Sequence, residues 1–406
     1  MYFQVHQPRR LSHLGFFDIG SDVGFFDDKL NEKIVRRVAD NCYQPTNLML
    51  LKLIDKYPQA RITFSISGVA LEQLVRYAPE VIDSFRALAT TGCVEFLGET
   101  YFHSLASLTD EREFGNQVEQ HRQAMKEVFG AVPVVFRNTE LIYSNDIGRM
   151  VKNLGFRGIY VEGVDGITRA SDPSLLLRHQ DRNGLAIFLR NFRLSDDISF
   201  RYADTTWNNW PLTSKRYLEW IHQVSGAGRI VNIGMDYETF GEHNKSAAGI
   251  LRFLRQVIEG VVKSGERRMV TPSEALSLLR AQETLSVPEP ISWADRQKDV
   301  SAWLGNDLQK DAFKSLNAVG KKVQALDDEE LLGCWRYLQT SDHFYYMSTK
   351  TGDDGYVHNY FSPYASPYEA FINYMNALAH LESLCTSRRK SSIRAKVTRV
   401  ITAVRA

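Results

Sequence analysis

The sequence contains few cysteines, and they form no motif. A chain of 406 residues has four, Cys42, Cys93, Cys334 and Cys385, and no two of them make a CxxC pair. Zinc ribbons and dithiol redox centres are built on such pairs, so neither is expected. With so few and such widely separated thiols, we also expect a chain without disulfide bonds.

Three other features are missing. The chain has no excess of one charge, since 49 Lys and Arg stand against 48 Asp and Glu, and this balance gives no electrostatic reason to bind nucleic acid or an anionic membrane. It has no uninterrupted apolar run long enough to cross a bilayer. Its first ten residues, MYFQVHQPRR, lack the basic and then apolar pattern of a secretory signal. We therefore expect a cytoplasmic protein with neither a nucleic-acid nor a membrane partner, of unknown oligomeric state.

Short apolar runs alternate with longer helical patterns as far as about residue 275. The predicted strands are Tyr2–His6, Ile62–Ser67, Val94–Gly98, Val134–Asn138, Gly158–Val161, Ala186–Arg190 and Ile230–Asp236. The predicted helices between them include Glu80–Leu88, Asp110–Val128, Ser214–Val224 and Ala248–Val262. This alternation is typical of an α/β protein with a mostly parallel sheet. Because no GxGxxG or GxxxxGK turn is present, seven strands favour a barrel over an open nucleotide-binding sheet.

One face of most predicted strands is polar. The polar rows are Gln4 and His6; Thr63, Ser65 and Ser67; Glu95 and Glu99; Asn138 and Glu140; and Asn232, Asp236 and Glu238. Side chains two residues apart on a strand point the same way, and buried acids need a partner or a function. We expect these rows to line the barrel and to meet near the carboxyl ends of the strands, where the active sites of barrels lie.

Beyond residue 280 the pattern becomes helical. The segment Thr284–Ser292, with two prolines, is predicted to be a connector. Helices are predicted at Trp293–Leu316, Glu329–Leu338 and Pro367–Leu384. The aromatic-rich insert Thr349–Pro363 is predicted to be an ordered loop, and apolar residues at helical spacing after Arg388 indicate a short amphipathic helix. The predicted domains are a catalytic barrel over residues 1–280, a helical domain over 281–387 and a basic amphipathic tail over 388–406.

The segment MDYETFGEH, Met235–His243, gathers acids at the end of an apolar strand. Asp236 and Glu238 share a parity, so both can face one pocket. Burial and mutual repulsion would raise the pKa of at least one of them, as a proton donor working near neutral pH requires. The alternative is that these acids cap the following helix or pair with Arg and Lys side chains.

Glu140 follows another apolar strand, in the segment FRNTELIY. A carboxylate there could attack an anomeric carbon. Two carboxyl groups about 5 Å apart across a glycosidic bond lead to retention of configuration, and about 6.5–9.5 Å lead to inversion; the sequence does not give this distance. The alternative is an ion pair with Arg137, which the opposite parity of the two residues disfavours.

Histidines and tryptophans near these segments are further candidates. His6 ends the first strand, and His103 follows Glu95 and Glu99. Two histidines with acids could hold a metal, as in a metal-dependent polysaccharide deacetylase, but no HxH or HxxxH pair supports this, and we predict neither a metal nor another cofactor. Trp210, in WNNWPLT, could stack on a sugar or cover the barrel mouth.

Five of these segments, taken in order, resemble the signature regions of glycoside hydrolase family 57. They are HQP on the first strand, GCVEF on the third, TEL after the fourth, MDYETFG after the seventh, and TPSEAL at Thr271–Leu276. The resemblance covers residues 1–276 and continues through SWADRQKDVSAWLGN and LQTSDHFYY. The family comprises α-amylases, 4-α-glucanotransferases, α-glucan branching enzymes and amylopullulanases.

The resemblance implies an incomplete (β/α)7 barrel followed by a helical domain that closes one side of the substrate cleft. It implies retention through a covalent glycosyl-enzyme, with Glu140 as nucleophile by the TEL match and Asp236 as acid/base by the DxExFG match. It assigns sugar binding to His6 and Glu95, a supporting role to Glu238, and substrate-facing positions to Trp293, Trp303, Asp342 and His343. From their positions alone, we add His103 and Trp210 to the candidate substrate-binding residues.

The predicted substrate is an α-glucan such as starch, glycogen or a maltooligosaccharide, and the predicted activity is hydrolysis of α-1,4 bonds, as in an α-amylase. Phe136 and Asn138 stand where many relatives carry aromatic or basic residues, and GEH follows the acid/base motif in place of GHW. These departures favour an amylase-like branch of the family and leave the acceptor open. A 4-α-glucanotransferase or branching enzyme is the alternative, and a non-catalytic glucan-binding protein is a more distant one.

Overall fold

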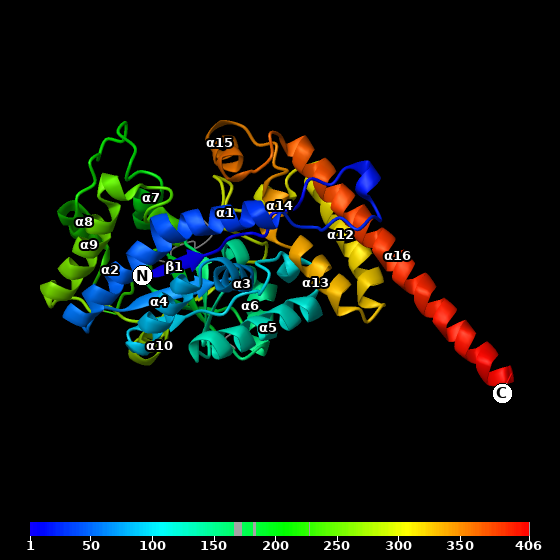
Figure 1. The fold of residues 1–406 in the computed structure, drawn as a ribbon. Helices are drawn as coiled ribbons and strands as arrows, with labels where there is room; N and C mark the ends of the chain where they lie inside the picture. The colour runs from blue at the N-terminus through cyan, green and yellow to red at the C-terminus, as the bar shows by residue number, and fades with distance from the viewer. Residues whose placement is uncertain (166–172, 182–183, 227, 406) are drawn as a thin grey trace. The chain divides into compact units, whose positions relative to one another are not determined.

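The computed structural model describes residues 1–165, 173–181, 184–226 and 228–405, with side chains described as far as residue 390 (Figure 1). The chain divides into two units. The first comprises Met1–Gln7 and Glu32–Ala294, and the second comprises Pro8–Asn31 and Asp295–Ala406. The protein is an α/β protein with parallel sheets and C-terminal helices, as predicted. The predicted division into domains at residues 280 and 387 stays a prediction.

Two sheets are present among the described residues of the first unit. One has the order β3 (Val94–Phe96), β2 (Ile62–Ile66), β1 (Tyr2–Val5) and β8 (Gly234–Asp236), and all its pairs are parallel. The other has the order β4 (Val135–Arg137), β5 (Gly158–Glu162), β7 (Ala186–Arg190), β6 (Leu176–His179) and β9 (Glu283–Leu285), with β6 antiparallel to β7. Isolated parallel bridges link the two sheets, at Gly98–Phe136 and at Arg190–Asn232.

All seven predicted strands are present, as β1 to β5, β7 and β8. The sequence missed β6 and β9, which have four and three residues. The predicted connector Thr284–Ser292 therefore begins inside β9 rather than after the last strand.

Helices separate most of the strands of the first unit. They are α1 (Asp28–Val38, which begins in the second unit), α2 (Gln44–Lys56), α3 (Gly68–Tyr77), α4 (Pro79–Thr90), α5 (Glu111–Phe129), α6 (Asn145–Asn153), α7 (Phe192–Ser199), α8 (Ser214–Val224), α9 (Ile250–Ser264) and α10 (Pro272–Leu278). Local chemistry sets their ends. The Asp110 side chain accepts hydrogen bonds from two N–H groups of the first turn of α5, and Gly130, at φ 65°, ends that helix in a left-handed conformation.

The register of the strands separates an apolar face from a polar one. Gln4 of β1 pairs with Ser65 on one side and with Asp236 on the other. The alternate residues Phe3 and Phe64 belong to the core cluster that packs on the helices, and burial of each such side chain contributes about 1.5–3 kcal/mol. A second cluster includes Tyr2, Val135, Tyr160 and Phe188. The polar side chains thus stand on strands that are anchored by apolar neighbours.

The second unit is mainly helical. Its helices are α11 (Ser301–Leu304), α12 (Asp307–Gln324), α13 (Glu329–Leu338), α14 (Ser341–Tyr345), α15 (Gly352–Phe361) and α16 (Pro367–Arg405). Asn373 of α16 fastens the inserted segment Pro8–Asn31, because its amide accepts from the Leu14 N–H at 2.7 Å and donates to the Ser12 carbonyl at 3.0 Å.

Two sequence predictions for this unit need correction. The insert Thr349–Pro363 is not a loop, because α15 occupies most of it. The predicted helix Trp293–Leu316 begins only at Ser301, and it is broken between α11 and α12. The predicted helix after Arg388 is the end of α16, while its predicted apolar face depends on side chains that lie outside the described residues.

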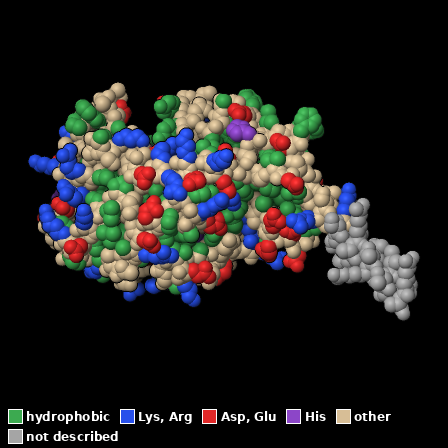
Figure 2. Space-filling view, viewed as in Figure 1, with side chains coloured by type: hydrophobic (Ala, Val, Ile, Leu, Met, Phe, Trp, Pro, Cys, Tyr) green, Lys and Arg blue, Asp and Glu red, His purple; other side chains and the backbone are tan. Residues whose placement is uncertain are grey.

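The surface gives two further observations. In the described part of the chain, no helix combines the length and the apolar character that crossing a membrane requires. Basic and acidic side chains are interspersed over the coloured part of the face shown in Figure 2.

Candidate active site

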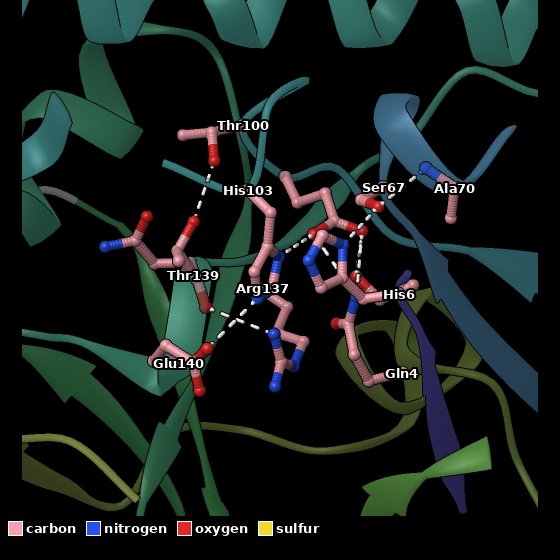
Figure 3. Close-up of polar contacts among 12 residues, drawn as sticks. Gln4, His6, Ser67, Ala70, Thr100, His103, Arg137, Thr139 and Glu140 are labelled. Carbon is pink, nitrogen blue, oxygen red and sulfur yellow. Dashed lines mark hydrogen bonds and ion pairs between the residues drawn. The ribbon is translucent and has the colours of Figure 1, made fainter. Parts of the chain in front are cut away.

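The carboxyl ends of the strands in the first unit gather acids and histidines, as the polar rows predict (Figure 3). Glu99, which follows β3, is fully buried. Its carboxylate accepts hydrogen bonds from the Gln4 side-chain amide at 3.3 Å and from Ser65 Oγ at 3.1 Å. Burial opposes the charged form of Glu99, but the hydrogen bond and charge of His103, together with the charges of His121 and Arg137, lower the pKa of this carboxyl group.

His103 joins two carboxylates. Its Nδ1 lies 3.1 Å from Glu99 Oε2, and its Nε2 lies 3.3 Å from Glu140 Oε1. The ring is almost completely buried, and burial alone would lower its pKa, but the two carboxylates raise it to about 9. His103 therefore contacts Glu140, the predicted nucleophile.

Glu140 is held by a second donor on its other oxygen. The indole Nε1 of Trp293 donates to Glu140 Oε2 at 2.7 Å, and the Trp293 backbone N–H donates to the Glu140 carbonyl at 3.2 Å. The Glu140 side chain is 17% exposed, so it is not sealed from solvent. Trp293, predicted to face the substrate, contacts the nucleophile candidate, and its contact with substrate stays a prediction.

Backbone strain is concentrated here. Six described residues other than glycine have a positive φ, and three of them are His103 at 50°, Glu140 at 56° and Leu141 at 52°. A left-handed conformation costs a residue with a Cβ about 1–2 kcal/mol and persists only where the surroundings enforce it. The turn is fastened by Asn138, whose side chain donates to Ser107 Oγ and to the Ile142 carbonyl.

This turn also corrects the predicted polar row of β4. Asn138 points to Ser107 and not to the same side as Glu140. The β4 side chains that face the same side as the site are instead Val135 and Arg137. Val135 packs in one cluster with Tyr2, and Arg137 acts electrostatically on Asp236. The positive φ of Glu140 breaks the two-residue alternation on which the prediction depended.

His6 lies beside His103. The two rings stack with centroids 3.9 Å apart and an interplanar angle of 20°. The Nδ1 of His6 lies 2.7 Å from Ser67 Oγ, and this hydroxyl also caps α3 by accepting from the Ala70 N–H. Ser67, which caps α3, therefore orients the His6 ring beside His103.

Asp236 ends β8, level with Gln4. Burial raises its pKa to about 6; Arg137 opposes this shift, and the Glu140 carboxylate adds to it. This effect of Glu140 on the pKa of Asp236 is the observation that connects the two carboxyl groups. Their environments differ: Glu140 accepts two N–H donors, while Asp236 is pushed toward its neutral form.

Arg137 is a cation inside the site that the sequence analysis considered only as an ion-pair partner. It is fully buried, and its guanidinium lies 4.6 Å from the centre of the Trp293 ring. Among the described residues, its Nε and Nη2 have no hydrogen-bond partner. The sequence placed Arg137 in a strand. It did not place Arg137 on the side of the site, because the left-handed turn at Glu140 breaks the alternation of side chains.

Glu238 follows Asp236 two residues later in the chain. It is buried, accepts a hydrogen bond from the Tyr43 hydroxyl, and accepts another from the Gln7 amide at 3.3 Å. Burial, followed by repulsion from Asp236, raises its pKa to about 8. At neutral pH the neutral form is therefore favoured, and Glu238 adds little negative charge beside Asp236.

For five further residues predicted to bind substrate, contact with substrate stays a prediction. Glu95 accepts from Ser273 N–H at 2.9 Å and Ser273 Oγ at 2.8 Å, at the start of α10. Trp210 is 46% exposed in the segment between α7 and α8. In the second unit, Trp303 of α11 and His343 of α14 are buried.

Asp342 also belongs to α14, and its role likewise stays a prediction. Over the described residues, no group of three or more His, Cys, Asp and Glu side chains has the geometry to hold a metal ion.

Comparisons with known proteins show which family the chain resembles. A family model described as Glycosyl hydrolase family 57 matches residues 1–288. A Methanocaldococcus jannaschii protein described as "Putative alpha-amylase" is 42% identical over 396 residues, which cover 94% of this chain and 83% of the relative.

Two solved structures share the fold. A branching enzyme from Pyrococcus horikoshii aligns with a TM-score of 0.67 at 16% identity, over 88% of this chain and 86% of that one. A 4-alpha-glucanotransferase from Thermococcus litoralis aligns with a TM-score of 0.64 at 14% identity, over 85% of this chain and 55% of that one. At these identities the two structures establish a common fold alone.

Proposed function

The chain belongs to glycosyl hydrolase family 57, and from this premise we propose that it hydrolyses α-1,4-glucosidic bonds of α-glucans with retention of configuration. The substrates are starch, glycogen or maltooligosaccharides. The 42% identical relative described as an alpha-amylase supports hydrolysis as the main reaction.

The observation that carries this proposal is the contrast between Glu140 and Asp236. A pair of carboxyl groups whose environments differ can divide the roles of nucleophile and proton donor. Glu140 accepts hydrogen bonds from His103 and Trp293, which favour its charged form. Asp236 has a pKa raised to about 6 by burial, as a proton donor near neutral pH requires.

In the first step, Asp236 protonates the glycosidic oxygen while the Glu140 carboxylate attacks the anomeric carbon. The bond between that carbon and the leaving sugar breaks, and an ester forms between the sugar and Glu140. Asp236 is then ionised. In the second step, Asp236 takes a proton from water, whose oxygen attacks the same carbon, and Glu140 leaves as a carboxylate.

The two bridges between the sheets support a finer description of the fold. We infer that β1, β2, β3, β4, β5, β7 and β8 form one seven-stranded (β/α) barrel, since Gly98–Phe136 joins β3 to β4 and Arg190–Asn232 joins β7 to the approach of β8. Glu140 and Asp236 would then both stand at the carboxyl end of the barrel.

The stereochemistry of the product tests the mechanism. A maltooligosaccharide of one length is incubated with the enzyme, and the newly formed reducing ends are followed by proton NMR before mutarotation. Appearance of the α anomer first is expected. Appearance of the β anomer first would rule out the ester intermediate.

The same incubation tests whether water or a sugar hydroxyl accepts the glycosyl group. Hydrolysis gives shorter chains only, and this is the expected result. A ladder that also contains longer chains would make the enzyme a 4-α-glucanotransferase, and new α-1,6 linkages would make it a branching enzyme. These outcomes leave the roles of Glu140 and Asp236 unchanged, because a sugar hydroxyl replaces water only in the second step.

A further inference from the structure

His103 has a carboxylate on each ring nitrogen. Nδ1 faces Glu99 Oε2 at 3.1 Å, and Nε2 faces Glu140 Oε1 at 3.3 Å. An ionised carboxylate only accepts hydrogen bonds, whereas a neutral imidazole has one donor nitrogen and one acceptor nitrogen. A neutral ring would therefore leave one of these two contacts without a proton.

The other contacts of the two carboxylates place the proton on the ring. Glu99 already accepts from Gln4 and Ser65, and Glu140 accepts from the Trp293 indole on its second oxygen. Donors of this kind stabilise a carboxylate over a carboxylic acid. Both acids are thus held as anions, and both ring nitrogens of His103 donate.

We propose that His103 is a positioning residue that remains an imidazolium throughout the reaction, and that Glu99 supplies the charge that keeps it so. This inference rests on the proposed function in one respect, namely that Glu140 is the nucleophile. His103 does not transfer a proton in this scheme. Its Nε2–H orients the Glu140 carboxylate for attack and stabilises it again when it leaves.

Glu99 matters most in the second step. Once Glu140 is esterified to the sugar, it no longer carries a negative charge. Glu99 is then the anion that still accepts a hydrogen bond from His103, and the ionised Asp236 adds a second favourable charge. If Glu99 were neutral, the buried imidazolium would lose its hydrogen-bonded counter-charge and would release its proton more readily. Glu140 would then have a poorer donor as it leaves.

Other charged and titratable groups around His103 are few. His6 stacks on the ring, Arg137 and Asp236 act on the same site from β4 and β8, and His121 of α5 acts on Glu99. Arg137 opposes a positive charge on His103, whereas Asp236 favours one when ionised. Among the described residues, Glu99 and Glu140 are in direct hydrogen-bond contact with the ring.

The first experiment measures the protonation of His103 by ¹⁵N and ¹H NMR of the histidine side chains, assigned by loss of the signal in His103→Gln. In the wild-type protein at pH 7.5, both ring nitrogens are expected to carry protons. In Glu99→Gln the pKa of His103 is expected to fall by one unit or more, consistent with the loss of a contacting charge. A neutral tautomer in the wild-type protein at pH 7.5 would overturn the proposal.

This readout does not depend on catalysis. If Glu140→Gln retained full activity, the proposed function would fail, yet the NMR titration would still report whether His103 is an imidazolium.

The second experiment follows the burst of leaving group from an activated aryl maltooligosaccharide. Glu99→Gln is expected to lower the steady-state rate about 10–100-fold, the scale of a charged hydrogen bond, with a burst showing that the glycosyl-enzyme accumulates. Glu99→Asp keeps the charge and should restore part of the rate. A rate loss in Glu99→Gln without a burst would contradict the assignment of Glu99 to the second step.

Glu113→Gln is the matched control, because Glu113 is also buried and accepts a hydrogen bond from Gln117 within α5. It is expected to change thermal stability without producing a burst or moving the His103 titration. If Glu113→Gln reproduced both effects, they would be structural, and the proposed role of Glu99 would be refuted.

Discussion

Trp293 holds Glu140 twice, with its indole N–H on the carboxylate and its backbone N–H on the carbonyl of the same residue. The two residues are 153 positions apart in the chain. The pair connects the turn after β4 to the last residues of the first unit. The orientation of the candidate nucleophile therefore depends on a segment far from it in sequence.

Replacement of Trp293 by Phe removes the indole donor and keeps an aromatic ring over Arg137. We expect kcat to fall about tenfold or more, since a hydrogen bond to a charged group contributes about 1.5–3 kcal/mol, while KM changes little. Steady-state kinetics check this. Trp335→Phe is the control, because it also removes a buried indole hydrogen bond, to the Leu316 carbonyl of the second unit. A rise in KM with unchanged kcat would instead indicate that Trp293 acts by stacking on sugar.

Replacement of Glu140 by Gln removes the nucleophile while keeping the shape of the side chain. We expect turnover to fall by roughly a thousandfold or more, with maltooligosaccharide binding retained in calorimetry. The control is Glu119→Gln, the same change at an exposed position of α5. Wild-type turnover in Glu140→Gln would remove this residue from the mechanism.

The pH dependence of kcat/KM is expected to report Asp236. A proton donor must be protonated, so activity should decline as pH rises above about 6, the raised pKa of this carboxyl group. Arg137 lowers that pKa, and Arg137→Met should therefore move the decline upward by about 1–3 pH units. The exposed Arg86→Met provides the comparison. A decline that stays in place in Arg137→Met would separate Arg137 from Asp236.

Glu238 is expected to make the protein less stable as pH rises. Its pKa in the folded protein is about 8, above its ordinary value of 4.5. Between these values the folded state holds a proton that the unfolded state has released, so the free energy of unfolding decreases with pH across this window and levels off above it. Thermal unfolding from pH 5 to pH 8 checks this.

Asp236 and His103 contribute in the same direction, because their pKa values are also raised. The contribution of Glu238 is therefore the difference between the wild-type protein and Glu238→Gln, in which the side chain cannot titrate. We expect a shallower dependence in the variant. Identical slopes in the two proteins would show that Glu238 is already ionised at neutral pH.

Glu95→Gln distinguishes two roles for a predicted sugar-binding residue. Because the Glu95 carboxylate binds Ser273 at the start of α10, we expect a lower melting temperature with KM and kcat close to wild type. Differential scanning calorimetry and kinetics check this. A several-fold rise in KM at unchanged stability would favour direct contact with substrate.

The strands and the polar rows were predictable because both depend on local alternation. β7 and α8 have the predicted bounds, and the rows of β1, β2 and β8 meet as expected. Glu99 belonged to a predicted polar row, and His103 was a candidate because it follows Glu95 and Glu99 in the sequence. Alternation does not predict which residue each of these side chains contacts.

Two features of the site depend on geometry that no periodic pattern contains. The left-handed turn at Glu140 breaks the alternation by which the sequence analysis disfavoured a pairing of Glu140 with Arg137. The contact of Trp293 with Glu140 joins segments that only the folded chain brings together. In the second unit, α15 was missed because Gly352, Gly355 and adjacent aspartates favour a loop by propensity.

The pairing of β1 with β8 has a consequence for how the chain is made. β1 lies between β2 and β8, so during synthesis β1 remains without one neighbour until residues 234–236 have left the exit tunnel. Throughout that interval, β1 exposes unsatisfied backbone groups that can pair with another chain. A ribosome that stalls before β8 would therefore release an aggregation-prone fragment, even though most of the residues of the first unit would already be present.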